Sequence, residues 1–496
     1  MLKFFGAGRP DHPMADPRDA RRILDELPTR DDQAVEELAH WHESLATVEG
    51  FSPERRFQLA AQIDEAAQPR LRKLAREYLA ATRPSRFQEA KMWGRLYEYY
   101  RQAGEAYGGC VEASVKGSAP AKGALPLLLV RALRSLAQQI KWLQVRYGPI
   151  DPALWGRLNR IYAFAEVRGL AEASAPVYPA VPGESTPRRE FLRAAMFSCS
   201  SPDCLLPPEV ELAERLIAEL APNFPFAAAP ARELPYWTDL ALPMAPQRAA
   251  KLPPLTPGLR CFGPGPAAGA LHALIERIDA TGEVPAALNL GARHAPQTVL
   301  DVMQHLSAVW SPGLPERKYL RHNVKSRLAV AHGFEGLLDA LGGADTLAFD
   351  KRADESWVVE NVSAGGFGAL VPQMHTEWLR VGTLLAMQPE GGSNWVVGVV
   401  RRVNRISDQE TRVGIQTLSK APTVSKFELR GAGTRYGVIL DRGEQAAIAL
   451  PAGVYAQGLN LESEHAGRQH VYMPQEVTAR GEDYEIVRFR EMVRES

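Results

Sequence analysis

The stretch Trp357–Val371, WVVENVSAGGFGALV, decides the fold of the C-terminal part of this chain. An apolar run with β-branched residues is followed by small and glycine residues and then by a second apolar run. This pattern predicts two strands joined by a turn. The polar hexad Asn361-x-Ser363-x-x-Gly366 lies at that junction. Two explanations fit it: an ordinary hairpin turn, or a surface that holds a ligand against backbone left bare by glycine.

Further short strands are predicted on the C-terminal side of this hairpin. The segments LRVGTLLAM, NWVVGVVRRV and TRVGIQTL are rich in β-branched residues, and strand signals continue through TRYGVILD, EQAAIALP and EDYEIVRFREM. Short strands separated by Gly, Pro, Asn, Asp and Ser predict a small antiparallel barrel or sandwich. We assign residues 313–425 to this barrel. Residues 426–496 are either a degenerate second barrel or strands that complete the first.

Residues 1–180 are predicted to form a helical domain. Ser52-Pro53-Glu54 predicts a helix start, because serine caps the free N–H groups and proline suits the first helical position. The motif Trp93-Gly-Arg-Leu-x-x-x-Tyr100 recurs as Trp155-Gly-Arg-Leu-x-x-x-Tyr162. It resembles the first helix of a tetratricopeptide repeat. Two ordinary amphipathic helices and a helical interaction scaffold with tetratricopeptide-like helical pairs both remain open.

The composition changes between these halves. Nine prolines lie between Pro222 and Pro257, mixed with alanine. Because proline removes backbone donors and stiffens the chain, we predict a Pro/Ala-rich linker with some helix over 181–262. Its aromatic residues Phe224, Phe226, Tyr236 and Trp237 are expected to contact a neighbouring surface. A helical connector is predicted over 263–312. The fold class is therefore a multidomain α + β protein.

The bulk composition limits location and partners. The 496 residues carry 58 Lys+Arg and 58 Asp+Glu, which argues against nucleic-acid binding and against a polybasic membrane anchor. The longest apolar run, Ala124–Val130, is far shorter than the ~20 residues of a membrane helix. The N-terminus lacks the apolar segment of a secretion signal. We therefore expect a cytoplasmic protein without membrane insertion.

No catalytic or metal motif is found. Cys199 and Cys204 have no companion Cys/His pair of zinc-binding spacing, and the four cysteines do not form a disulfide framework. HExxH, GxSxG and phosphate-loop signatures do not occur. We expect no enzyme activity, no catalytic residues, no metal and no cofactor.

A basic segment, PERKYLRHNVKSRLAV, precedes the predicted strands. Arg317 and Arg321 are four positions apart, so they lie close together on a turn or short helix. Each guanidinium is a planar fork that pairs with phosphate oxygens or with the O6/N7 edge of guanine. Lys325 and Arg327 follow in the same segment.

Arg-x-x-x-Arg followed by Asn-x-Ser-x-x-Gly resembles the PilZ domain, a bacterial receptor domain for cyclic di-GMP. The resemblance covers about 313–422 and leaves the helical half unassigned. It implies that Arg317 and Arg321 clamp guanine and phosphate, while Asn361, Ser363 and Gly366 form a cradle on the barrel. Because HNVKSR lies between Arg321 and the first clear strand, Lys325 and Arg327 are additional candidates for phosphate contacts.

The resemblance also implies a function. We expect a cyclic di-GMP receptor whose arginine segment moves onto the barrel when the ligand binds. The helical half would pass this change to an unidentified protein partner in the control of motility, pili or exopolysaccharide. The alternative is a helical adaptor whose PilZ-like domain binds no ligand.

Overall fold

The computed structural model describes residues 10–80, 86–118, 123–251, 253–313, 319–342, 355–372, 378–407, 409–429, 433–443, 445–455, 459–465 and 467–494. Contacts divide the chain into two units. The first comprises Met1–Arg146, Ile150–Pro202 and Pro207–Pro315. The second comprises Glu316–Ser496 and the short segments Tyr147–Pro149 and Asp203–Leu206.

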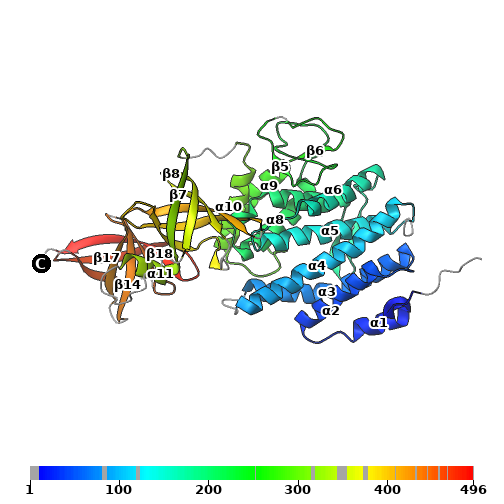
Figure 1. Ribbon diagram of the computed structural model, residues 1–496, viewed down its shortest axis with the longest axis horizontal. Coiled ribbons are helices and arrows are strands. Elements are labelled where there is room, and N and C mark those ends of the chain that lie inside the picture. The colour runs from blue at the N-terminus through cyan, green and yellow to red at the C-terminus, as the bar shows by residue number, and fades with distance from the viewer. Residues whose placement is uncertain are drawn as a thin grey trace, which may run out of the picture. The chain divides into compact units, whose positions relative to one another are not determined.

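The first unit is mainly helical (Figure 1). In the described part of the chain, none of the helices is long and apolar enough to cross a membrane. The α-helices of this unit are α1 (Pro17–Asp25), α2 (Asp31–Thr47), α3 (Pro53–Ala80), α4 (Arg86–Val115), α5 (Leu125–Gln144), α6 (Pro152–Val167), α7 (Pro187–Cys199), α8 (Pro207–Leu220), α9 (Pro266–Thr281) and α10 (Pro296–Trp310).

Several of these helices begin with a capping side chain followed by proline. The predicted start at Ser52 is confirmed, because its hydroxyl accepts a hydrogen bond from the Arg55 N–H (3.2 Å) and α3 begins at Pro53. Asp151 caps α6 in the same way, accepting from the Ala153 N–H (2.8 Å). Proline at the first helical position loses no intrahelical hydrogen bond.

Helix α5 is the central element of this unit. It packs against α4, α6, α7 and α8, and fifteen of its 20 residues are buried. A helix buried on all sides must satisfy its polar groups internally. Arg131, which is 1% exposed, donates to Glu65 (2.6 Å) and to the Val177 carbonyl (3.0 Å).

A buried carboxylate lies next to α5. Asp64 accepts hydrogen bonds from the hydroxyls of Tyr99 (3.0 Å), Tyr107 (3.0 Å) and Tyr178 (3.2 Å). Burial, and next to it the charge of Asp64, raises the pKa of each of these phenols, so they remain protonated donors. The cluster explains how a charge is accommodated in the helical core.

The repeated Trp/Leu/Tyr motif lies on α4 and α6, which have 30 and 16 residues. A tetratricopeptide repeat of about 34 residues contains two helices. Helix α4 alone is almost that long, so the two motifs lie on bundle helices of unequal length. Trp155 and Tyr162 are buried, and the Trp93 indole donates to the Trp142 carbonyl (2.7 Å).

The prediction of a Pro/Ala-rich linker with some helix over 181–262 is correct for the helix, but the stretch is folded and not an extended linker. This stretch contains α7, α8 and a four-stranded sheet in the order β3-β6-β4-β5, and the hairpin of β1 and β2 overlaps its start. Phe224 packs edge-on against Trp310, and Phe226 against Tyr162. The prolines begin helices and flank short strands here. The strands are β1 (Ala175–Tyr178), β2 (Val181–Ser185), β3 (Phe226–Ala227), β4 (Tyr236–Asp239), β5 (Gln247–Arg248) and β6 (Leu259–Phe262).

The second unit begins with a closed six-stranded antiparallel barrel in the order β7-β8-β9-β12-β11-β10, with β10 pairing back to β7. Trp357 and Val359 of β8 point into its core with Ala369 and Val371 of β9, as the alternating pattern predicts. The strands are β7 (His322–His332), β8 (Glu355–Ser363), β9 (Gly366–Pro372), β10 (Leu384–Pro389), β11 (Val396–Ser407) and β12 (Glu410–Ser419).

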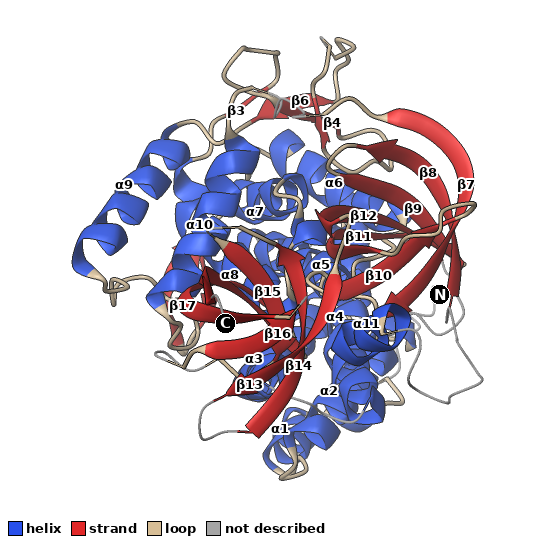
Figure 2. Cartoon of the chain, turned by 90° about the vertical axis from the view of Figure 1, so that its left-hand side faces the viewer, coloured by secondary structure: helices blue, strands red, loops and turns tan. Residues whose placement is uncertain are grey.

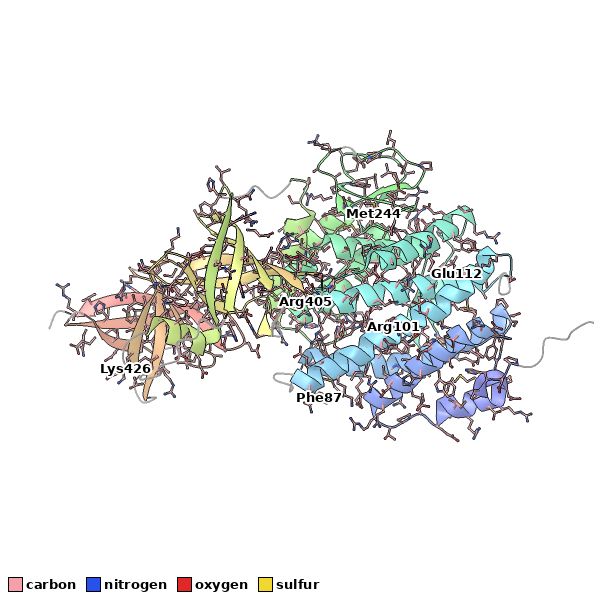
Figure 3. The ribbon with its side chains drawn as sticks, in the orientation of Figure 1. Phe87, Arg101, Glu112, Met244, Arg405 and Lys426 are labelled. Carbon is pink, nitrogen blue, oxygen red and sulfur yellow. The ribbon has the colours of Figure 1, made fainter. Side chains whose placement is uncertain are left out.

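The C-terminal residues form a second closed barrel (Figure 2). Of the two predicted alternatives for 426–496, a barrel of its own is therefore the one found. Exposed Lys426 on its first strand, labelled in Figure 3, is followed by buried Phe427. Its strands are β13 (Thr423–Leu429), β14 (Gly433–Asp441), β15 (Ala446–Pro451), β16 (Leu461–His465), β17 (Arg468–Arg480) and β18 (Tyr484–Arg494). Their order, β13-β14-β15-β18-β17-β16, repeats that of the first barrel strand for strand.

The two barrels share an apolar interface. Helix α11 (Gly333–Leu341), which the sequence did not predict, follows β7, and its Phe334 N–H donates to Asp483 of the second barrel (2.6 Å). The Tyr484 hydroxyl donates to the Gly382 carbonyl (2.7 Å). The buried residues of this interface are Ala331, Phe334, Leu337, Leu384, Ala386 and Val397 on one side and Val438, Leu440, Ala449, Tyr484 and Ile486 on the other.

Candidate functional site

Strand pairing brings the basic segment to the Asn-x-Ser-x-x-Gly hairpin. Strands β7 and β8 are antiparallel, with His322 opposite Val362 and Asn323 opposite Asn361. Arg321 directly precedes His322, so it lies beside the end of β8 at Ser363. The Tyr319 ring lies against the turn, because a Cβ on Gly365 would be 2.8 Å from its Cδ2. Arg317 lies outside the described residues.

The hairpin itself is a two-residue turn. Ser363 pairs with Gly366, and the Ser363 hydroxyl donates to the Gly366 carbonyl (3.3 Å). The Gly365 carbonyl accepts from the Thr417 N–H of β12 (3.0 Å). A side chain at Gly366 would overlap the Ile415 carbonyl oxygen. Glycine is therefore required here by the close approach of β12.

The outer face next to this hairpin consists largely of bare backbone. A β-bulge at Glu360 precedes Asn361, which pairs with Gly368, and Gly368 pairs with Gly414 of β12. The Asn361 amide occupies the space that a Cβ on Gly368 would fill, since Nδ2 lies 2.6 Å from that position. Within the described residues this amide has no hydrogen-bond partner. The face thus presents an unpaired amide over a floor of glycine.

Several cations surround this face, and most are already paired. Arg412 makes two hydrogen bonds to Glu360 (2.8 and 3.0 Å), and this contact raises the pKa of the arginine. Arg401 donates to Gln416 (2.7 Å), which pairs with Gly366. Among the described residues Arg321 has no ion-pair partner. Its guanidinium is therefore available for an external acceptor.

The two additional candidates for phosphate contacts, Lys325 and Arg327, lie at different distances from the hairpin. Lys325 lies in the irregular stretch of β7 between Asn323 and Ser326, close to Asn361, and is exposed. Arg327 pairs with Val358, about 10 Å further along β8 from Asn361. Its guanidinium donates weakly to the Ser356 hydroxyl (3.4 Å). Of the two, only Lys325 lies near the hairpin.

Sequence reasoning missed the contribution of β12 to this face. Gly414 and Gln416 lie about fifty positions beyond the hairpin and reach it only through strand pairing. The sequence TRVGIQTL did indicate which residues face outward, because apolar Val413 and Ile415 alternate with Gly414 and Gln416. In the structure Val413 and Ile415 are buried, so Gly414 and Gln416 lie on the outer face.

The described residues contain no cluster of three or more His, Cys, Asp or Glu side chains that could hold a metal ion. Cys199 and Cys204 are free thiols whose pKa values are raised chiefly by burial, to about 12 for Cys204. Raised pKa values disfavour the thiolate that metal binding and nucleophilic attack require.

Comparison with known proteins places these two units in one family. Residues 18–231 match the model described as "Cyclic-di-GMP receptor FimW, N-terminal domain", and residues 350–423 match "Cyclic-di-GMP receptor FimW, middle PilZ domain". No individual curated protein matches the chain. The two matches together span more than half of the chain and follow the order of its helical and first-barrel parts. The chain therefore belongs to the FimW family of cyclic-di-GMP receptors.

Proposed function

We propose that cyclic di-GMP binds on the outer face of the first barrel, against Arg321 and the Asn361–Gly366 hairpin. Arg317 is the second arginine of this site, and Lys325 contributes a phosphate contact. Ligand binding is relayed through the helical unit to a protein partner in the control of motility, pili or exopolysaccharide.

The observation that carries the proposal is the pairing of β7 with β8. It brings the backbone of Arg321 to the end of β8 at Ser363, two positions from Asn361, and this supports a site to which both side chains contribute. A guanidinium pairs in a bidentate manner with guanine O6/N7 or with phosphate, and an amide offers both a donor and an acceptor to a base edge. Because Gly368 has no Cβ, the Asn361 amide lies close against the backbone, where it can meet the edge of a base.

The direct test is calorimetric titration of the full chain with cyclic di-GMP. A bidentate guanine contact contributes roughly 1–3 kcal/mol, so Arg321→Ala should weaken binding by about tenfold to hundredfold. Arg435→Ala is a matched control, because Arg435 is an exposed arginine on β14 of the second barrel. Equal affinities for wild type and Arg321→Ala would contradict the proposed site.

The relay is tested separately from binding. A partner should be recovered on the full chain in amounts that change with saturating cyclic di-GMP, and Arg321→Ala should remove that change. Recovery that does not depend on the nucleotide would favour a helical adaptor with a non-binding barrel. We further propose that the chain catalyses no reaction of its own, so cyclic di-GMP should be recovered intact after prolonged incubation.

A further inference from the structure

A charged cavity lies within the helical unit, remote in sequence from the hairpin of the first barrel. Its volume is about 510 Å³, and its walls come from α3, α4, α5, α7, α8, the end of β1 and the loop at Asn289–Gly291. This volume falls in the range of small-molecule sites, roughly 300–1,000 Å³. Six cations line it: Arg72, Arg76, Arg134, Lys141, Arg193 and Arg215.

Four of these cations are held in place by three buried glutamates. Burial raises the pKa of Glu211, but Lys141 and Arg215 lower it further, to about 2, so this carboxylate is ionised at neutral pH. The pKa of Glu190 is likewise lowered by Arg134 and Arg193 despite burial. The ion pairs are Lys141–Glu211 (2.7 Å), Arg215–Glu211 (2.7 Å), Arg193–Glu214 (2.6 Å) and Arg134–Glu190 (2.5 Å).

The remaining two cations, Arg72 and Arg76, are not neutralised. They are exposed residues four positions apart on α3, so their side chains project from the same face. No carboxylate among the described residues forms an ion pair with either of them. The lining therefore has six cations against two carboxylates, Glu211 and Glu214; with Glu190, which lies outside the lining but pairs with Arg134, the excess is three positive charges.

The excess of positive charge indicates that the cavity binds an anion with more than one negative charge. We propose that the cavity binds a small organic phosphate carrying two phosphoryl groups, such as a nucleoside diphosphate. A carboxylate would cancel only one of the three charges, whereas each phosphate monoester carries roughly −1.5 to −2 at pH 7. The guanidinium forks of Arg72 and Arg76 suit phosphate oxygens, and the paired cations are already held rigidly. Leu71 and Trp142 add apolar wall for the organic body.

The test is calorimetric titration of the full chain with two probes, pyrophosphate and guanosine diphosphate. Both should bind saturably, and the double variant Arg72→Ala/Arg76→Ala should weaken both by at least about tenfold, since hydrogen bonds to charged groups are lost. Both arginines are exposed and alanine favours helix, so the variant should keep the unliganded thermal midpoint. Arg160→Ala is the matched control, an exposed arginine on α6 outside the cavity.

Four results would overturn the proposal. They are no saturable binding of either probe, unchanged affinity in the double variant, an equal loss in Arg160→Ala, and acetate binding as tightly as pyrophosphate. Arg321→Ala should leave pyrophosphate affinity unchanged. Loss of pyrophosphate binding in that variant would assign the pyrophosphate to the barrel and would also overturn the proposal.

Discussion

The two barrels have the same strand order, yet they differ at the hairpin that carries the candidate site. Both have a bulge after a buried aliphatic residue, Val359 in the first and Ile439 in the second. The next pair is Asn361 opposite Gly368 in the first barrel and Asp441 opposite Ala447 in the second. The second barrel thus keeps a polar residue at this position but places a methyl group on the floor.

The entry strands differ as well. Arg321 directly precedes β7, whereas Pro422 directly precedes β13, and the connection from β12 to β13 contains Lys420 but no arginine. The glycine at position 366 has Gln445 as its counterpart, two residues before Ala447. The same strand order therefore forms with and without the residues of the proposed site. If the proposed site is right, ligand binding depends on the arginine and glycine positions that only the first barrel has.

The largest effect is expected from filling the glycine floor. Gly366→Ala places a Cβ on the Ile415 carbonyl, so the hairpin must move away from β12. We expect a loss of about 1–3 kcal/mol in the free energy of unfolding and about a hundredfold weaker cyclic di-GMP binding. Denaturant unfolding and calorimetry measure these. Gln445→Ala, at the equivalent position of the second barrel, should leave both unchanged. Weaker binding in Gln445→Ala would show that the second barrel also takes part in ligand binding.

The next effect concerns the equivalent polar pair. Asn361→Ala removes an amide that faces outward without a partner, so binding of cyclic di-GMP should weaken by about tenfold, with little change in unfolding. Asp441→Ala should change the affinity by less than about twofold, because the second barrel lacks the arginine segment. Comparable losses in titrations of both variants would indicate that each barrel binds a ligand.

Part of the fold and of the candidate site could be predicted from the sequence. The hairpin could be predicted because its turn and motif lie within six consecutive residues and the flanking strands alternate. The contributions of Gly414 and Gln416, and the charged cavity lined by five helices, could not, since only tertiary pairing brings these residues together. The stretch 181–262 was misjudged because proline at helix starts and strand ends has the composition of a linker. Helix α11 was missed although Phe334, Leu337, Leu338 and Leu341 have helical spacing, because the segment is only nine residues long and lies among strands.

A smaller effect is expected on the pH dependence of stability, which Glu491 of the second barrel should influence. In the second barrel Glu491 pairs with His470 (2.7 Å) and accepts from the Tyr472 hydroxyl (3.0 Å). Burial raises the pKa of Glu491, but these two hydrogen bonds lower it further, to a net value below its ordinary 4.5. Because the pKa of Glu491 is lower in the folded than in the unfolded chain, its ionised carboxylate stabilises the fold at pH values above about 4.5. This stabilisation is lost as the pH falls through the pKa of Glu491 in the folded chain.

Glu491→Gln should therefore lower the free energy of unfolding by about 1 kcal/mol at pH 7, and the difference from wild type should shrink below about pH 4. Urea unfolding across pH 3–7 measures it. Cyclic di-GMP affinity at pH 7 should stay within about twofold of wild type. A large affinity loss would mean that the second barrel supports the site of the first through their shared interface.

The smallest effect is expected at the surface ion pairs, which occur in both barrels. Arg412 pairs with Glu360 next to Asn361 in the first barrel, and Arg488 pairs with Glu476 in the second (2.6 Å). Exposed pairs contribute little, so Arg412→Ala and Arg488→Ala should each change the free energy of unfolding by less than about 1 kcal/mol.

The two variants should nevertheless differ in ligand binding. Losing Arg412 removes a positive charge beside the proposed site, so the affinity for the anionic cyclic di-GMP should fall a few-fold at about 10 mM salt. The difference should disappear near 1 M salt, where the screening length falls from about 30 Å to about 3 Å. Arg488→Ala should show neither change, because its charge lies on the barrel that lacks the arginine segment. A salt-dependent loss in Arg488→Ala equal to that in Arg412→Ala would mean that the ligand responds to the net charge of the β unit, and the local role of the first barrel's outer face would have to be abandoned.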